Sequence, residues 1–206
     1  MSLGEINMYT GAGNAIISIV QQDSEIQKVL DIGSYTGLGT TLCIVTGAIT
    51  RPEYSPVSVL SLETNAEHLE MSQKNWENRP GKEMVQFCRA RVAKSMMTDA
   101  EIRAHPVFDQ WKVHYDRWHD SDIANFIQAP LIEINSNIDL VIIDGGEYCG
   151  YQDYMAIKRC NPKYLMLDDI NTMKTDRVLQ DALQSGYSLI YRTEDRNGFA
   201  ILKRST

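Results

Sequence analysis

The chain has 206 residues, a net charge of −7 and 43% hydrophobic residues. This length and composition fit one globular domain with a substantial core and exclude a disordered chain. The negative charge argues against a general nucleic-acid surface, and no apolar run approaches the roughly 20 residues that a membrane span needs. No basic segment with an apolar secretory core opens the chain, so we expect a cytoplasmic protein without a membrane partner.

Hydrophobic patterns predict helices and strands that alternate along the chain. Such alternation is typical of a mostly parallel sheet with helices on both faces. The predicted elements are, in order, a helix through 15–20, a strand from 29, a helix at 39–49, a strand at 57–63, a helix ending near 78, strands at 84–88 and 138–144, a helix at 151–159, a strand at 164–168, a helix around 179–183, and a hairpin of 188–192 and 199–203.

Residues 93–137 do not fit a minimal α/β fold, because ordinary connections take about 2–6 residues besides their helix. One interpretation is a lid or substrate wall at the ligand end of the sheet, where aromatic residues favour a flat or apolar ligand. The other is an extra helix that covers the sheet edge, with Trp111, Tyr115 and Trp118 packed inward at helical spacing. The aromatic and imidazole residues of this span are Trp111, His114, Tyr115, Trp118 and His119.

The first strand runs directly into a glycine-bearing turn and a helix. Gly33 and Gly37 give the backbone freedom and remove Cβ atoms where a ligand approaches, and the N–H groups of the following helix favour polar or anionic groups. Asp31 is expected at the carboxyl end of the strand, where open parallel sheets bind ligands. The spacing is G-x-x-x-G-x-G, so the dinucleotide fingerprint is absent. We therefore predict a nucleotide-type cofactor site at Asp31, Gly33, Ser34, Tyr35, Thr36 and Gly37.

The second strand ends on a carboxylate, Glu63. A carboxylate at this place can accept two hydrogen bonds from the vicinal hydroxyls of a ribose. The alternative is a helix-start carboxylate, since a helical pattern begins at Asn65. We favour the ribose role because the glycine turn and Glu63 occur together.

These motifs resemble those of class I S-adenosylmethionine (SAM)-dependent methyltransferases, most closely the catechol and caffeoyl-CoA O-methyltransferase group. The resemblance rests on L-D-I-G-S-Y-T-G-L-G-T-T at 30–41 and L-S-L-E-T-N at 60–65, and it extends to 138–146 and 164–169. It implies a Rossmann-like, doubly wound, mostly parallel seven-stranded sheet with a C-terminal antiparallel hairpin and helices on both faces. It also implies one methyltransferase domain over residues 1–206 that binds SAM.

In the related metal-dependent enzymes, acidic groups at the ends of strands four and five hold a divalent ion. Asp144, Asp168 and Asp169 match those positions, with Asp169 in place of an asparagine. Three converging carboxylates repel unless a cation or protons neutralise them, which favours Mg²⁺ or another hard divalent ion. The alternative is that Asp168 or Asp169 caps a helix and Asp144 orders a loop.

The chain departs from the pattern of these O-methyltransferases at two places, after the predicted third strand and after the predicted fourth strand. The usual basic residue after the fourth-strand aspartate is absent, and Glu147 stands nearby. We assign catalysis to Asp144 and Glu147, with Glu147 as the base, and also place Asp144 in the cofactor site; the alternative is an enzyme that relies on the metal alone. Ala90 and Arg91 replace the small polar or acidic residue that the group has near the adenine.

The resemblance implies methyl transfer (EC 2.1.1.-) to the hydroxyl of a small molecule, either a sugar or a phenolic metabolite. The expected partner is that acceptor, with no nucleic acid, and a homodimer stays open. The alternative is a Rossmann-like NAD-type binding protein or oxidoreductase that uses the same turn and Glu63. The missing pyrophosphate fingerprint favours SAM.

Overall fold

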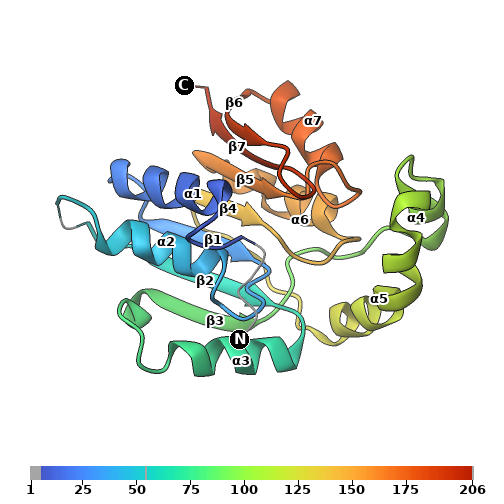
Figure 1. Ribbon diagram of the computed structural model, residues 1–206, viewed down its shortest axis with the longest axis horizontal. Helices are drawn as coiled ribbons and strands as arrows, with labels where there is room; N and C mark the ends of the chain where they lie inside the picture. Colours follow the sequence, from blue (N-terminus) through green and yellow to red (C-terminus); the bar gives the residue numbers. More distant parts are fainter. Residues whose placement is uncertain (1–5, 54, 206) are drawn as a thin grey trace.

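The computed structural model describes residues 6–53 and 55–205 and contains one seven-stranded sheet in the order β3-β2-β1-β4-β5-β7-β6 (Figure 1). The first five strands pair in parallel, and β7 is antiparallel to both β5 and β6. The predicted parallel sheet with a C-terminal hairpin is confirmed. The strands are β1 Lys28–Ile32, β2 Ser58–Glu63, β3 Val85–Arg89, β4 Leu140–Ile143, β5 Tyr164–Asp168, β6 Tyr187–Thr193 and β7 Phe199–Arg204.

The strand order reverses between β1 and β4. The chain builds β1, β2 and β3 outward in one direction and then returns to place β4 on the other side of β1. Connections that leave the two strands in opposite directions open a crevice at their carboxyl ends, and open α/β sheets bind ligands there. The two ends lie level, since Ile32 pairs with Ile143 and the Asp144 N–H donates to the Ile32 carbonyl at 2.9 Å.

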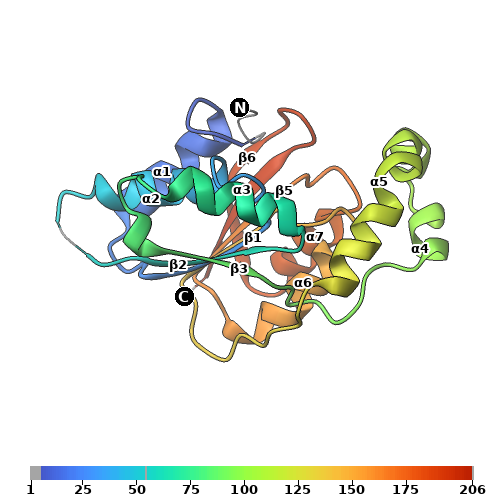
Figure 2. The same cartoon turned by 90° about the horizontal axis from the view of Figure 1, so that it is seen from below.

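Helices cover both faces of the sheet, as the alternation predicts (Figures 1 and 2). Neighbouring residues of a buried parallel strand point to opposite faces, so Val29 packs in one core and Leu30 in the other. The first core contains side chains of α1 Gly11–Gln22, α2 Thr40–Ile49 and α3 Ala66–Trp76, and the second those of α6 Gly150–Ile157 and α7 Asp176–Gln184. Two short 3₁₀ turns, Lys82–Met84 and Lys158–Cys160, complete these connections.

Two predicted details differ in the structure. The fourth strand is assigned from Leu140, two residues later than predicted, although the backbone of Asp139 still bonds to Lys28 and Tyr164 at 2.9 Å and its carboxylate accepts the N–H groups of Gln27 and Lys28. Leu183, expected on the apolar face of α7, is exposed. No described helix combines the length and apolarity required to span a membrane.

Residues 93–137 contain two helices, α4 Asp99–Ala104 and α5 Phe108–Gln128. They stand beyond the carboxyl ends of the parallel strands and not along an edge strand (Figures 1 and 2). Tyr115 is buried and Trp111 is half-buried, but Trp118 is 45% exposed. The expectation that all three aromatic residues pack inward is therefore wrong for Trp118, although its i+7 spacing puts it on the same side of the helix as Trp111.

Candidate active site

The glycine turn brings β1 against β4 and α3. Gly33 has a φ of 98°, and a Cβ there would lie 2.2 Å from the Asp144 carbonyl oxygen. Gly37 has a φ of 71°, and its carbonyl accepts the Trp76 indole N–H at 2.8 Å. The glycines are thus required by close neighbours in the protein as well as by positive φ, and they hold the crevice between β1 and β4 narrow.

Replacing Gly33 with alanine should destabilise the fold more than the same change at Gly186. Both positions have positive φ, and an alanine there costs about 1–2 kcal/mol, but a Cβ at Gly186 would meet no described atom within 4 Å. Urea unfolding of Gly33→Ala should therefore show a loss in the free energy of unfolding at least about twice that of Gly186→Ala. Equal losses would show that Asp144 moves aside without penalty.

Asp31 is fully buried and lies under the turn instead of facing it. Its carboxylate accepts hydrogen bonds from the hydroxyls of Thr40, Thr41 and Ser61 at 2.9, 2.5 and 3.1 Å. Burial raises its pKa to about 6, against the effect of these hydroxyl donors. Asp31 fastens the start of α2 to β1 and β2, so the direct ligand contact expected for it is not what this arrangement provides.

Glu63 faces a cavity at the carboxyl ends of β1, β2 and β4, which we call the strand-end cavity. Its two carboxylate oxygens accept the N–H groups of Tyr35 and Asn65 at 2.8 and 2.9 Å. Burial raises the pKa of Glu63, and these backbone donors oppose the rise. Each oxygen keeps capacity for a further hydrogen bond. The N-cap of α3 is Asn65, which accepts the N–H of Glu67 at 2.9 Å, and Glu63 in turn accepts the N–H of Asn65, so the helix-start contact and the cavity-facing position occur together.

The strand-end cavity has a volume of about 210 Å³. Ala90 and Arg91 line it after β3, where the Arg91 guanidinium lies 4.6 Å from the centroid of the Phe126 ring. In the turn above it, the hydroxyls of Ser34 and Thr36 are buried and make no hydrogen bond within the described chain. Buried hydroxyls normally have partners, and of these two residues Ser34 lines a cavity, so its hydroxyl is the one that a polar ligand can reach.

The carboxylates of Asp144, Asp168 and Asp169 converge as predicted, with one oxygen of each within 4.8 Å of the others. The ammonium of Lys174 lies among them. Its Nζ is 2.5 Å from Asp169, 3.3 Å from Asp144 and 3.9 Å from Asp168. Arg196 approaches from the rim, 3.9 Å from both Asp168 and Asp169.

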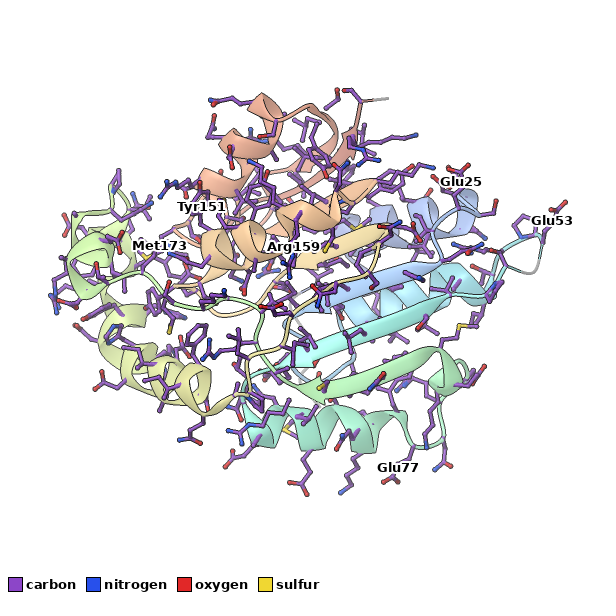
Figure 3. All side chains as sticks on the ribbon, turned by 180° about the vertical axis from the view of Figure 1, so that it is seen from behind. Glu25, Glu53, Glu77, Tyr151, Arg159 and Met173 are labelled. Atoms are coloured by element: carbon purple, nitrogen blue, oxygen red, sulfur yellow. The ribbon has the colours of Figure 1, made fainter. Side chains whose placement is uncertain are left out.

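The loop after β5 explains how one lysine meets two successive aspartates. Asp169 has a φ of 56°, a left-handed conformation that breaks the strand alternation and lets the carboxylates of Asp168 and Asp169 reach the same cation. The Asn197 amide donates to Asp169 at 2.8 Å and holds it there. Farther along the loop, Met173 packs with Ile102 of α4 and Tyr115 of α5, on the side of the molecule seen in Figure 3.

Charge and burial oppose each other in this cluster. Burial alone would lower the pKa of Lys174, but the carboxylates raise it well above its ordinary value, so Lys174 stays protonated. Burial and the neighbouring Asp168 raise the pKa of Asp144, whereas for Asp169 the effect of Lys174 outweighs that of burial and lowers the pKa. Lys174 supplies the positive charge that sequence analysis assigned to a metal ion.

These residues do not fit a divalent ion as they are arranged. A magnesium ion needs its carboxylate oxygens at about 2 Å, and the Lys174 ammonium stands where such an ion would make those contacts. The predicted convergence of the three carboxylates is therefore present, but a side chain from the same loop neutralises it. Sequence analysis missed Lys174, whose signal is a basic residue five positions after Asp169.

Glu147 lies behind this cluster. Burial raises its pKa to about 7, against the effect of Lys174, and its Oε1 has no hydrogen-bond partner among the described residues. It is not among the residues that line the strand-end cavity or the second cavity described next. Glu147, predicted as a base, therefore does not line either cavity in which a substrate could bind.

A second cavity of about 480 Å³, the α5 cavity, opens between the glycine turn, the Lys174 cluster and α5. His114, Trp118 and Asp122 line it from positions one helical turn apart on α5. The residues that line both cavities are Gly33, Tyr35, His68, Asp122 and Asp144. Asp122 was not among the predicted site residues. The signal that could have found it is the i, i+4, i+8 spacing of His114, Trp118 and Asp122, which puts the three on one side of a helix.

No family model and no curated protein sequence matches this chain. Solved structures do match. An O-methyltransferase from Bacillus cereus in complex with S-adenosylhomocysteine (SAH) has a TM-score of 0.61 at 14% identity, with 98% of this chain and 84% of that chain covered. Cofactor-bound Rv0187 from MTB has a TM-score of 0.61 at 16% identity, with the same coverage of 98% and 84%.

A methyltransferase with a different acceptor matches as well. Precorrin-6y C5,15-methyltransferase from Geobacter metallireducens has a TM-score of 0.57 at 12% identity, and the match covers 100% of this chain and 93% of that one. At such identities the likeness shows the fold alone, and the fold does not select an acceptor. The chain has the Rossmann-like methyltransferase fold, as its sequence motifs imply.

Proposed function

We propose that this chain is a SAM-dependent methyltransferase (EC 2.1.1.-) that acts on a hydroxyl group of a small molecule. The observation that carries the proposal is the Glu63 carboxylate, which faces the strand-end cavity beside the glycine turn at the strand-order reversal. In open α/β sheets this is where a nucleoside ribose binds. The Bacillus cereus neighbour, an O-methyltransferase with SAH, supports the same ligand and reaction type.

The residues present fit SAM. Glu63 would accept the ribose hydroxyls, Arg91 and Phe126 would flank the adenine end, and the unpartnered Ser34 hydroxyl, on a residue that lines the adjoining α5 cavity, would meet a polar group of the methionine part. When bound, SAM supplies an electrophilic methyl group on a sulfonium. The protein's own task is then to align an acceptor oxygen and remove its proton.

The acceptor side is assigned to α5 and the Lys174 cluster. Asp144 and Asp122 line both cavities, so their carboxyl groups lie between donor and acceptor. We assign residues 93–137 as the substrate wall, because α5 lines both cavities. Lys174 fixes Asp144 and keeps the converging carboxylates from repelling one another, and the proposal contains no metal ion.

Calorimetric titration of the purified protein with SAH and, separately, with NAD tests the proposal. We expect SAH to bind, NAD to give no heat of binding, and both results to be unchanged by Mg²⁺. NAD binding without SAH binding would overturn the methyltransferase assignment in favour of an NAD-type protein. Absence of binding by either compound would overturn it as well.

A further inference from the structure

The α5 cavity has an unusual lining for a small-molecule site. Such sites are mostly lined by hydrophobic side chains with a few polar groups. Here Ile6 is the one aliphatic side chain among the described residues that form the wall, and the other lining side chains are polar, charged or aromatic. They include the carboxylates of Asp122, Asp144 and Asp168 and the ammonium of Lys174.

We propose that the acceptor is a carbohydrate, a pyranose ring that packs on Trp118 and places its reacting hydroxyl beside Asp122. This inference rests on the proposed function and narrows its substrate class. Ionised carboxylates only accept hydrogen bonds, so a wall with several of them favours a ligand with several hydroxyl donors. A phenolic metabolite offers one or two hydroxyls and would leave most of these acceptor oxygens without a donor.

Trp118 supplies the flat surface that a sugar ring needs. It lines the cavity and remains 45% exposed, although large aromatic side chains are usually buried. The Arg117 guanidinium lies 4.8 Å from the centroid of its ring and helps to fix the ring plane. Tyr35, which also lines the cavity, is exposed too and stacks edge-on with His68 at 4.6 Å between centroids. The C–H face of a pyranose can pack between such rings while its hydroxyls reach the polar wall.

Asp122 is the carboxylate best placed to receive the acceptor's proton. It lines both cavities, and unlike Asp144 it forms no ion pair with Lys174 in the described structure. In the reaction, a lone pair of the acceptor oxygen forms the bond to the methyl carbon, and the carbon–sulfur bond breaks with its electron pair going to sulfur. The hydroxyl proton passes to the Asp122 carboxylate, which leaves a neutral methyl ether and a neutral thioether.

The experiment offers the wild-type protein tritiated SAM with methyl pyranosides that cover the gluco, manno, galacto, xylo, fuco and rhamno configurations. Catechol and caffeic acid serve as phenolic acceptors. We expect methyl transfer to at least one pyranoside about tenfold or more above that to the phenols. We also expect saturation-transfer NMR to show the same pyranoside bound in the presence of SAH, which is a readout independent of turnover.

Variants on α5 test the named residues. Trp118→Ala should raise KM for the accepted pyranoside about tenfold with little change in kcat. Asp122→Asn should lower kcat by about 100-fold or more while SAH affinity stays within a few-fold. Val113→Ala and Asp120→Asn, which change exposed residues of the same helix, should leave both parameters unchanged.

Three results would overturn the inference. They are a preference for the phenols, SAH binding without binding or methylation of any pyranoside, and an Asp122→Asn protein as active as the Asp120→Asn control. Each of these would leave the methyltransferase assignment standing. Failure to bind SAH at all would instead overturn the proposed function itself.

Discussion

Replacing Lys174 with methionine should lower the free energy of unfolding by about 3–5 kcal/mol, because it leaves buried carboxylates without their cation. Methionine keeps most of the side-chain volume, so packing changes little. The same variant should acquire a divalent-cation site, since Asp144, Asp168 and Asp169 offer oxygens within 4.8 Å of one another once the ammonium is gone. Mg²⁺ or Mn²⁺ should therefore raise the melting temperature of Lys174→Met and leave that of the wild type unchanged.

Two further variants distinguish the effect of the lost Lys174 charge from a general loss of stability on substitution. In Lys174→Met/Asp169→Asn one negative charge is removed together with the lysine, so this double variant should recover part of the lost stability. Lys112→Met breaks an exposed pair with Asp116 and should cost no more than about 1 kcal/mol. A wild-type protein that Mg²⁺ stabilises as strongly as it stabilises Lys174→Met would show that the ion and the lysine do not compete.

Replacing Glu63 with glutamine should weaken SAH binding by about 10- to 100-fold, measured by calorimetry. The amide loses the negative charge and one acceptor oxygen, and a hydrogen bond to a charged group contributes about 1.5–3 kcal/mol. Glu63→Ala should abolish measurable binding, because it also leaves the N–H groups of Tyr35 and Asn65 without their acceptor. The turn then keeps only its backbone hydrogen bonds to β2, from Gly33 and Ser34 to the Leu62 carbonyl at 2.9 and 3.1 Å, among those described.

The matched control for this pair is Glu70→Gln. Glu70 is exposed on α3, a few residues beyond Glu63, and is not among the residues that line either cavity. Its replacement should leave SAH affinity unchanged. If Glu63→Gln bound SAH as tightly as Glu70→Gln, the carboxylate would not contact the ligand, and the ribose assignment would have to be withdrawn.

Much of the site could be predicted because it follows the carboxyl ends of strands. Glu63 and Asp144 end buried apolar runs, and the ends of neighbouring parallel strands meet at one edge of the sheet. This rule places residues but does not orient them. Asp31 stands one residue before the end of β1, so it pairs in register with Ser61 and points with it toward the start of α2.

Lys174 and Asp122 could not be placed from the sequence. The path of the loop to Lys174 depends on the left-handed backbone at Asp169 and on contacts with α4 and α5. An aspartate with positive φ is uncommon and gives no periodic signal. The position of α5 over the strand ends is likewise a tertiary contact, so the side of α5 that meets a cavity could not be read from the helical pattern of residues 108–128.

The small number of buried residues in α5 also determines which substitutions this helix tolerates. Tyr115 and Phe126 are its buried residues in a helix of 21 residues, whereas the central strands β4 and β5 are buried throughout. Substitutions on the cavity side of α5 therefore alter little packing, and exposed changes of this kind usually shift stability by less than about 0.5 kcal/mol. A lineage that carries this fold can therefore change the wall of the α5 cavity at His114 and Trp118, which do not line the strand-end cavity, and leave the lining of the strand-end cavity as it is.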